Sequence, residues 1–92
     1  MIKGFRCRET EKIFERRHSR KFVGIQRPAL KKLLILDAAG SLADLRVPPS
    51  NQLEKLSGDR RGQHSVRVND QWRVCFRWRD GHAFDVEIVD YH

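Results

Sequence analysis

The feature that most constrains the fold is the period-two spacing of apolar residues between positions 63 and 89. Apolar side chains occupy alternate positions there in three runs: Val66 and Val68; Trp72, Val74, Phe76 and Trp78; and Phe84, Val86 and Ile88. Charged or small residues fill most positions between them. Because successive side chains of a strand point to opposite faces, the pattern predicts three half-buried strands, each with an apolar and a charged face.

The connection between the last two runs decides how their strands pair. A two-residue turn at Asp80 and Gly81 would bring apolar residues to both faces of the hairpin, which is costly where one face is buried. A three-residue loop over residues 80–82 keeps the apolar side chains together and pairs Trp78 with Phe84. The sequence therefore favours the longer loop.

On the charged face, this register sets Arg77 opposite Asp85 as a structural ion pair. A loop over residues 69–71 likewise sets Arg67 opposite Arg73. Adjacent like charges on a sheet are unfavourable unless an anion lies between them. The two arginines are therefore either a clamp for a phosphate group, since guanidinium matches two phosphate oxygens, or a solvated strand surface.

The N-terminal half predicts two helices, over residues 8–17 and 28–40, with a short strand at residues 2–6 and a loop at residues 18–27. Pro28 is expected at the first helical position. The second helix has an apolar stripe, and three of its polar residues are expected to face water: Lys31, Lys32 and Asp37. The chain is thus expected to be one α+β domain over residues 1–92, with two N-terminal helices packed on the apolar face of an antiparallel sheet.

The charge of the chain limits its partners. The formal net charge is +7 and the pI about 10.1. A small domain this basic usually binds nucleic acid, an anionic membrane or an acidic protein. Membrane is the least favoured, because no apolar run approaches the roughly 20 residues of a spanning helix. The N-terminus lacks the apolar core of a signal peptide, so the expected location is the cytoplasm.

No cofactor and no metal site are expected. The four histidines lack metal-ligand spacing, and there is no glycine-rich nucleotide loop. Cys7 and Cys75 lie far apart in the sequence and are expected to be reduced and mostly buried.

Three further segments each allow two interpretations. Asp90, Tyr91 and His92 suit proton transfer, with Tyr91 near the arginine pair by parity, or they form a frayed terminus. The basic turn at residues 58–62 either cradles phosphates or is a solvated loop. The basic cluster at residues 16–21 suits electrostatic docking on RNA, or it is an exposed helix end.

Residues 51–76, together with residues 86–92, closely resemble HigB-type toxins of the RelE/ParE superfamily. The strand Val68-Asn69-Asp70-Gln71-Trp72-Arg73 and the Asp-Tyr-His ending carry the resemblance. It implies a small twisted antiparallel sheet with two helices on one side. It also implies the toxin of a type II toxin–antitoxin module that cuts mRNA in the ribosomal A site. The expected partners are the ribosome and mRNA, a HigA-like helix-turn-helix antitoxin and, through their complex, operator DNA.

The resemblance also implies roles for individual residues. The family's catalytic arginine matches Arg73, and its terminal Tyr and His match Tyr91 and His92, with Asp90 beside them. In this metal-independent reaction the ribose 2′-OH attacks the adjacent phosphorus, and Arg73 stabilises the charge of the phosphorane. Tyr91 or His92 takes the proton of the 2′-OH. The residues expected to bind RNA or the ribosome are basic: Lys12, Arg16, Arg17, Lys55, Arg60, Arg61 and Arg67.

One segment departs from several relatives, which carry Leu-His-Pro-Leu-Lys-Gly where this chain has residues 53–58. Glu54 stands at the His position and Ser57 at the Lys position. Glu54 either acts as a catalytic base or weakens phosphate binding by repulsion. Lys55 replaces the missing charge only if its side chain turns inward, whereas parity places it differently.

Two other functions remain open from the sequence. The chain could be a non-enzymatic toxin that blocks a target such as DNA gyrase, as ParE-type relatives do. It could also be a corepressor that acts only with its antitoxin. The Asp-Tyr-His ending favours the nuclease, because a blocking protein has no need of proton-transfer groups.

Overall fold

The computed structural model describes residues 1–90, which form two helices and a four-stranded antiparallel sheet of order β1-β2-β3-β4. The helices are α1 (Arg8–Phe14) and α2 (Gln26–Ala38), and the strands are β1 (Glu54–Lys55), β2 (His64–Arg67), β3 (Trp72–Arg79) and β4 (His82–Asp90). Short 3-10 helices occupy the connections: η1 (Val23–Ile25), η2 (Leu42–Arg46), η3 (Pro49–Asn51) and η4 (Gly58–Arg60). The expected α+β class is confirmed.

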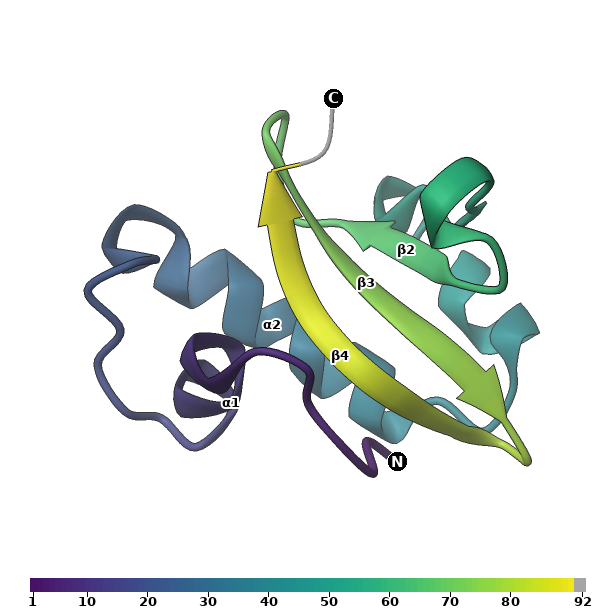
Figure 1. The fold of residues 1–92 in the computed structure, drawn as a ribbon, viewed down its shortest axis with the longest axis horizontal. Helices are drawn as coiled ribbons and strands as arrows, with labels where there is room; N and C mark the ends of the chain where they lie inside the picture. Colours follow the sequence, from purple (N-terminus) through teal and green to yellow (C-terminus); the bar gives the residue numbers. More distant parts are fainter. Residues whose placement is uncertain (91–92) are drawn as a thin grey trace.

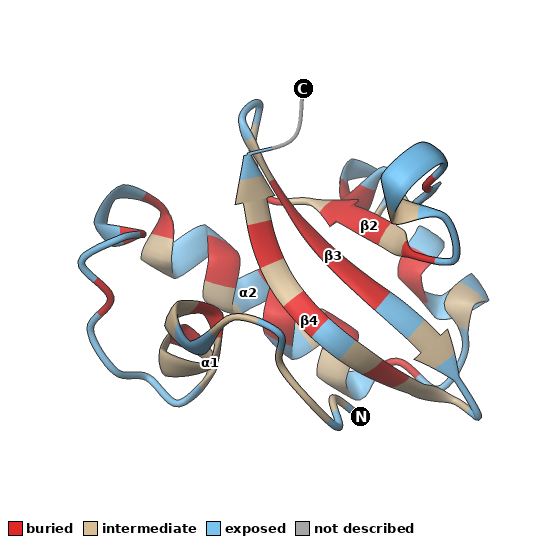
Figure 2. Ribbon diagram, in the orientation of Figure 1, coloured by how far each residue is buried: buried red, intermediate tan, exposed pale blue. Residues whose placement is uncertain are grey.

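The core lies between α2 and the sheet. In Figure 1, α2 runs behind the long, twisted β3–β4 hairpin, and α1 lies beside β4. Buried segments follow β3, β4 and the inner face of α2 (Figure 2). The core side chains come from both helices and from strands β2, β3 and β4, and include Ile13, Leu33, Leu36, Val66, Val74, Phe76, Val86 and Ile88. The predicted apolar face of the sheet is therefore the one that the helices cover.

The β3–β4 turn differs from the predicted three-residue loop. Asp80 and Gly81 form a two-residue turn with φ of 54° and 80°, the positive values that such hairpin turns require. Trp78 consequently pairs with Ala83. The register shifts by one residue farther along, where Asp85 takes a φ of 52° in an irregular segment. Because of this irregularity, the apolar side chains of both strands lie on one face again, whereas the short turn alone would have placed them on both faces.

Beyond the irregularity, the pairing is the predicted one, with Cys75 opposite Glu87. The β2–β3 register is confirmed as well, because Arg67 pairs with Arg73. Asn69 closes that turn with its side-chain oxygen, which accepts from the backbone N–H groups of Gln71 (2.9 Å) and Trp72 (2.8 Å).

The N-terminal segment covers the free edge of β4. It runs parallel to β4 with two isolated bridges, Ile2 to Ala83 and Phe5 to Val86, so the strand predicted at residues 2–6 is only partly formed. The backbone N–H of Lys3 donates to the Ala83 carbonyl at 2.8 Å. This pairing satisfies groups that an exposed sheet edge would leave open.

Both helices differ from their predicted bounds. The first ends at Phe14 rather than at residue 17, and Arg16 has a φ of 60°. The second begins at Gln26, so η1 and the start of α2 occupy part of the predicted loop. Pro28 is tolerated at the third helical position, because the N–H groups of the first turn have no partner within the helix.

The prediction that Lys32 faces water is wrong. This residue is only 8% exposed, and its ammonium group donates to Oδ1 of Asn51 at 2.6 Å. Burial lowers the pKa of Lys32, and the positive charges of Lys31 and Arg67 add to the effect. The helical pattern missed this because the partner, Asn51, comes from η3, 19 residues farther along the chain.

Candidate active site around Arg73

Arg73 is a buried side chain near the start of β3, and hydrogen bonds hold its Nε and Nη2. It is 7% exposed. Its Nε donates to Oγ of Ser65 at 2.7 Å, and its Nη2 donates to the backbone carbonyls of Gln52 and Ser65. The predicted catalytic arginine is therefore held by its neighbours on β2 and by the segment before β1, rather than standing on an open surface.

Glu54 meets Arg73 across the outer face of the sheet. Its Oε1 lies 3.8 Å from Nη1 of Arg73, and its side chain is 51% exposed. Glu54 pairs with Ser65 in the sheet, so β1 places the carboxylate beside the same serine that holds the guanidinium. The structure thus brings two predicted site residues together at a point that solvent reaches from the side of Glu54.

Asn51 holds the backbone next to the carbonyl that Arg73 contacts. It is completely buried at the end of η3, and its Nδ2 donates to the carbonyls of Leu45 (3.1 Å) and Val47 (3.3 Å) while its Oδ1 accepts from Lys32. The next residue, Gln52, has a φ of 44° and presents its carbonyl to Arg73. The buried Lys32–Asn51 pair therefore fixes the backbone group that orients the guanidinium.

Arg67 lies opposite Arg73 in the sheet but has its own counterion. Its Nη2 forms a close contact with a carboxylate oxygen of Asp70, which is almost fully exposed. Each arginine of the pair thus has an acidic neighbour, Asp70 or Glu54. An anion that approaches this face has to displace these carboxylates from the two arginines.

Asp90 brings the end of β4 close to the same region. It pairs with Trp72, the residue before Arg73, and its Oδ2 accepts from Nε2 of Gln71 at 3.0 Å. Tyr91 and His92, predicted to transfer the proton, lie outside the described residues. Their roles remain predictions.

Lys55 does not join Arg73. It neighbours Glu54 on β1 but points to the other face of the sheet, where it pairs with His64 and lines a hollow with Arg46. The placement of Lys55 that parity predicted is confirmed, and its role in RNA binding stays a prediction.

The two arginines of the glycine-flanked turn have separate environments. Arg60 contacts Glu87 on β4 (3.3 Å) and Gln63 (3.1 Å), while Arg61 is exposed. Cys75 is buried nearby, and this burial raises the pKa of its thiol. Arg60 is therefore engaged in an ion pair across the sheet, and Arg61 remains available to a polyanion.

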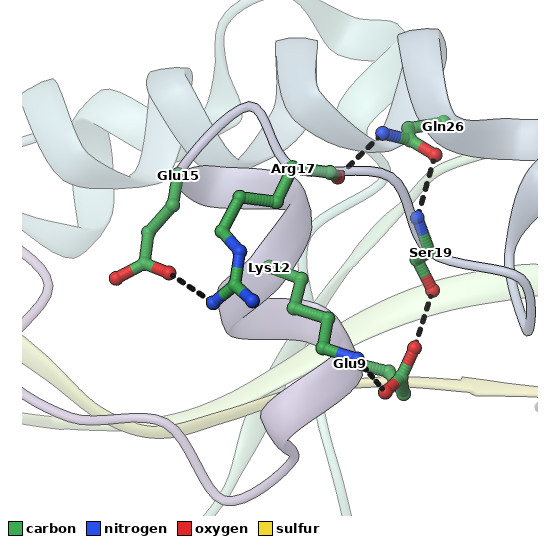
Figure 3. Close-up of polar contacts among 6 residues, drawn as sticks. All are labelled: Glu9, Lys12, Glu15, Arg17, Ser19 and Gln26. Carbon is green, nitrogen blue, oxygen red and sulfur yellow. Dashed lines mark hydrogen bonds and ion pairs between the residues drawn. The ribbon is translucent and has the colours of Figure 1, made fainter.

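The predicted RNA-binding residues in α1 and just after it lie at the opposite edge of the sheet from β1, because α1 packs beside β4 (Figure 1). Lys12 contacts Glu9 at 2.8 Å, and Arg17 contacts Glu15 at 3.5 Å (Figure 3). Arg16 donates to the carbonyl of Phe14 at 2.9 Å. The predicted RNA-binding residues thus do not form one patch, and only Arg67 adjoins Arg73.

Glu9 fastens α1 to the following loop. Figure 3 shows its carboxylate between Lys12 and the buried Ser19, whose Oγ donates at 2.9 Å. The Ser19 N–H in turn donates to the Gln26 side chain at 3.2 Å. This chain of contacts ties α1 to the start of α2.

The Glu9 carboxylate gives a pH-dependent contribution to stability. The hydrogen bonds from Lys12 and then Ser19 lower its pKa below 4.5. The contribution is fully present above the pKa of the unfolded chain and is lost as pH falls through the lower folded-state pKa. Glu9→Gln is therefore expected to lower Tm at about pH 7, with the difference from the parent shrinking below about pH 4 in thermal melts followed by circular dichroism. Glu15→Gln is the matched control, and an equal Tm difference at every pH would contradict the assignment.

Sequence reasoning missed the residues that hold Arg73. Ser65 could have been found, because the predicted register places it on the same face as Arg67 and Arg73. Gln52 and Asn51 carried no signal, since they act through a backbone carbonyl and through an irregular segment. Within residues 1–90, no group of three or more His, Cys, Asp or Glu side chains is arranged to hold a metal ion.

Comparison with known proteins agrees with this fold. The sequence model of the HigB-like toxin family, described as the RelE-like toxin of type II toxin-antitoxin system HigB, matches residues 3–92. The chain belongs to this family. As the toxin of a type II toxin–antitoxin system, it has an antitoxin as its partner.

Individual relatives extend the comparison. Toxin HigB-1 of Vibrio cholerae is 41% identical over 86 residues, covering 91% of this chain and 90% of the relative. Endoribonuclease HigB of Proteus vulgaris is 33% identical over 61 residues, covering 66% of this chain and 65% of the relative. The crystal structure of YafQ from E. coli aligns over 98% of this chain and 93% of its own with a TM-score of 0.60 at 15% identity, a likeness of fold.

None of the helices formed by residues 1–90 has the length and apolar character needed to cross a membrane.

Proposed function

We propose that this HigB-like toxin is an endoribonuclease that cuts mRNA in the ribosomal A site. The observation that carries the proposal is the guanidinium of Arg73, fixed by Ser65 and Gln52 and facing the exposed Glu54 at 3.8 Å. A fixed guanidinium suits a phosphate whose charge increases during reaction, because it needs no reorganisation. The relative named Endoribonuclease HigB supports the endoribonuclease part of this proposal.

The proposed reaction needs no metal. The ribose 2′-OH attacks the adjacent phosphorus, and the bond to the 5′-oxygen of the next nucleotide breaks. Tyr91 or His92 accepts the proton of the 2′-OH, and another group returns a proton to the leaving oxygen. Arg73 stabilises the phosphorane, with Asp90 beside the terminal pair. The products are a 2′,3′-cyclic phosphate and a 5′-OH.

Glu54 competes with RNA for Arg73 in this scheme. Its carboxylate occupies the exposed side of the guanidinium, where the phosphate has to bind. Glu54→Gln removes the negative charge and is expected to raise kcat/KM about threefold to tenfold in single-turnover cleavage, as removal of one exposed repulsive charge does. Asp59→Asn, a change of equal charge in η4, is the control. A drop of about 100-fold with loss of the acidic limb of the pH–rate profile would instead identify Glu54 as the base.

The ribosome supplies the rest of the site in this proposal. The basic residues that the sequence predicts to bind RNA or the ribosome bind ribosomal RNA and hold the toxin against the A-site codon, which contributes proximity. In the cytoplasm, a HigA-like helix-turn-helix antitoxin neutralises the toxin, and their complex binds operator DNA.

The test is primer extension on a defined mRNA incubated with purified toxin, with and without translating ribosomes. Cuts that appear only with ribosomes, in register with the A site, and that leave cyclic phosphate ends are expected. Intact mRNA in the presence of toxin that still arrests cells would overturn the proposal and favour a blocked target such as gyrase. A toxin harmless without its antitoxin would favour the corepressor.

A further inference from the structure

A basic hollow lies on the other face of β1 from Arg73. Its volume is about 300 Å³, and it lies between η2 and the paired residues Lys55 and His64. Three basic or titratable side chains and three apolar ones line it: Arg46, Lys55 and His64, and Leu42, Ala43 and Leu53. A lining of basic and apolar side chains together suits a ligand with an anionic group and a flat apolar part.

The positive charge of this hollow is not neutralised within the described chain. Neither Arg46 nor Lys55 forms an ion pair among residues 1–90, and no carboxylate belongs to the lining. Asp44, in the same short helix as Arg46, is used elsewhere: its Oδ2 accepts from the N–H groups of Gly40 (2.9 Å) and Ser41 (3.1 Å). Two unpaired cations at one opening attract an anion.

His64 provides the flat wall of the hollow. Its ring stacks on Phe76 with centroids 6.1 Å apart, and its Nδ1 is buried with no hydrogen-bond partner among the described residues. Burial lowers the pKa of His64, and the positive charge of Lys55 adds to the effect. The imidazole is therefore neutral at physiological pH and reports any anion that enters, because a nearby negative charge favours protonation.

We propose that this hollow binds one nucleotide of the RNA strand, with its phosphate at Arg46 and Lys55 and its base against Leu42, Ala43 and Leu53. The proposal rests on the proposed function, in that RNA is the ligand. Glu54 and Lys55 are consecutive on the edge strand and point to opposite faces. An RNA strand that passes over this edge reaches Arg73 on one face and the hollow on the other. The nucleotide belongs either to the mRNA or to ribosomal RNA.

The test follows the His64 imidazole by NMR during titration with a 2′-O-methyl hexaribonucleotide, which cannot be cut. His64→Gln assigns the signal, and inorganic phosphate is the base-free probe. The hexamer is expected to raise the pKa of His64 more than phosphate does. Arg46→Ala with Lys55→Ala is expected to weaken hexamer binding at least about tenfold and to reduce the dependence on log salt by about 0.7 per lost contact.

The matched control is Arg27→Ala with Lys31→Ala, which removes two exposed positive charges from α2. It is expected to change affinity by less than about twofold, because diffuse attraction is screened by salt. Equal loss in both double variants, or a hexamer that leaves His64 unchanged, overturns the proposal. Binding to mRNA-free ribosomes distinguishes the two sources of the nucleotide. If Arg46→Ala with Lys55→Ala weakens binding to these ribosomes, the nucleotide belongs to ribosomal RNA, and if it weakens binding to the hexamer alone, the nucleotide belongs to mRNA.

This readout does not depend on cleavage. If the toxin does not cleave mRNA but the hexamer still raises the pKa of His64, the nuclease proposal is wrong and the hollow remains a site that binds RNA. If the toxin cleaves mRNA on the ribosome but the hexamer leaves the pKa of His64 unchanged, the nucleotide site in the hollow is wrong and the nuclease proposal stands. Circular dichroism melts of both double variants establish that they are folded, as expected for changes at exposed side chains.

Discussion

Arg73→Ala is expected to reduce ribosome-dependent mRNA cleavage by about 100-fold or more, the usual cost of removing one donor that stabilises a developing oxyanion. Arg73→Lys is expected to lose at least about tenfold, because an ammonium group lacks the planar fork that can bond Ser65, Gln52 and a phosphate together. Single-turnover cleavage followed by primer extension measures both effects.

The control for Arg73 has to separate chemistry from folding, since the side chain is buried. Arg77→Ala removes a more exposed guanidinium from the same strand, where it pairs with Asp85 at 3.6 Å, and should leave cleavage within about threefold. Ser65→Ala keeps Arg73 but removes its 2.7 Å acceptor, so it tests positioning, with an expected loss in kcat rather than in KM. If an Arg73→Ala protein with a clear cooperative melt cleaves at the parent rate, the arginine serves the fold alone.

Sequence reasoning reached the arginine pair because parity alone determines which side chains share a face. The Arg67–Arg73 register depends on the length of one turn and on a pattern repeated along both strands. The turn at Asp80 was predicted wrongly for an instructive reason. An Asp-Gly pair readily takes the two positive φ values of a two-residue turn. The irregularity at Asp85 then returns the apolar side chains to one face of the hairpin, and the alternation of apolar residues in the sequence does not predict such an irregularity.

The surroundings of Arg73 could not be predicted, because they come from residues with no periodicity. Gln52, whose backbone is in the left-handed conformation, acts through its carbonyl, and Lys32 has its partner in Asn51, outside the helix. A helical pattern marks a lysine as solvent-facing unless something covers it. The distribution of the other basic residues over both edges of the sheet is likewise a property of the assembled fold.

The effects of substituting Lys32 and Asn51 on the free energy of unfolding should depend strongly on each other, because the pair joins a charge to an amide at a buried position. Asn51→Leu leaves the ammonium group without its 2.6 Å acceptor and the carbonyls of Leu45 and Val47 without their donor. It is expected to cost about 3–5 kcal/mol in the free energy of unfolding, because each unpaired buried group costs about 1–3 kcal/mol and a charged one costs more. Lys32→Met leaves only an amide oxygen unpaired and is expected to cost about 1–3 kcal/mol.

In the double variant the uncompensated charge is absent, so its loss should be smaller than the sum of the two single losses by at least about 1 kcal/mol. Urea unfolding of the four proteins measures this difference, and additive losses would show that the two residues act independently. Because Asn51 fixes the backbone beside Gln52, the double variant should also cleave more slowly than the parent at temperatures where both are fully folded. The same buried contact would then stabilise the fold and orient Arg73.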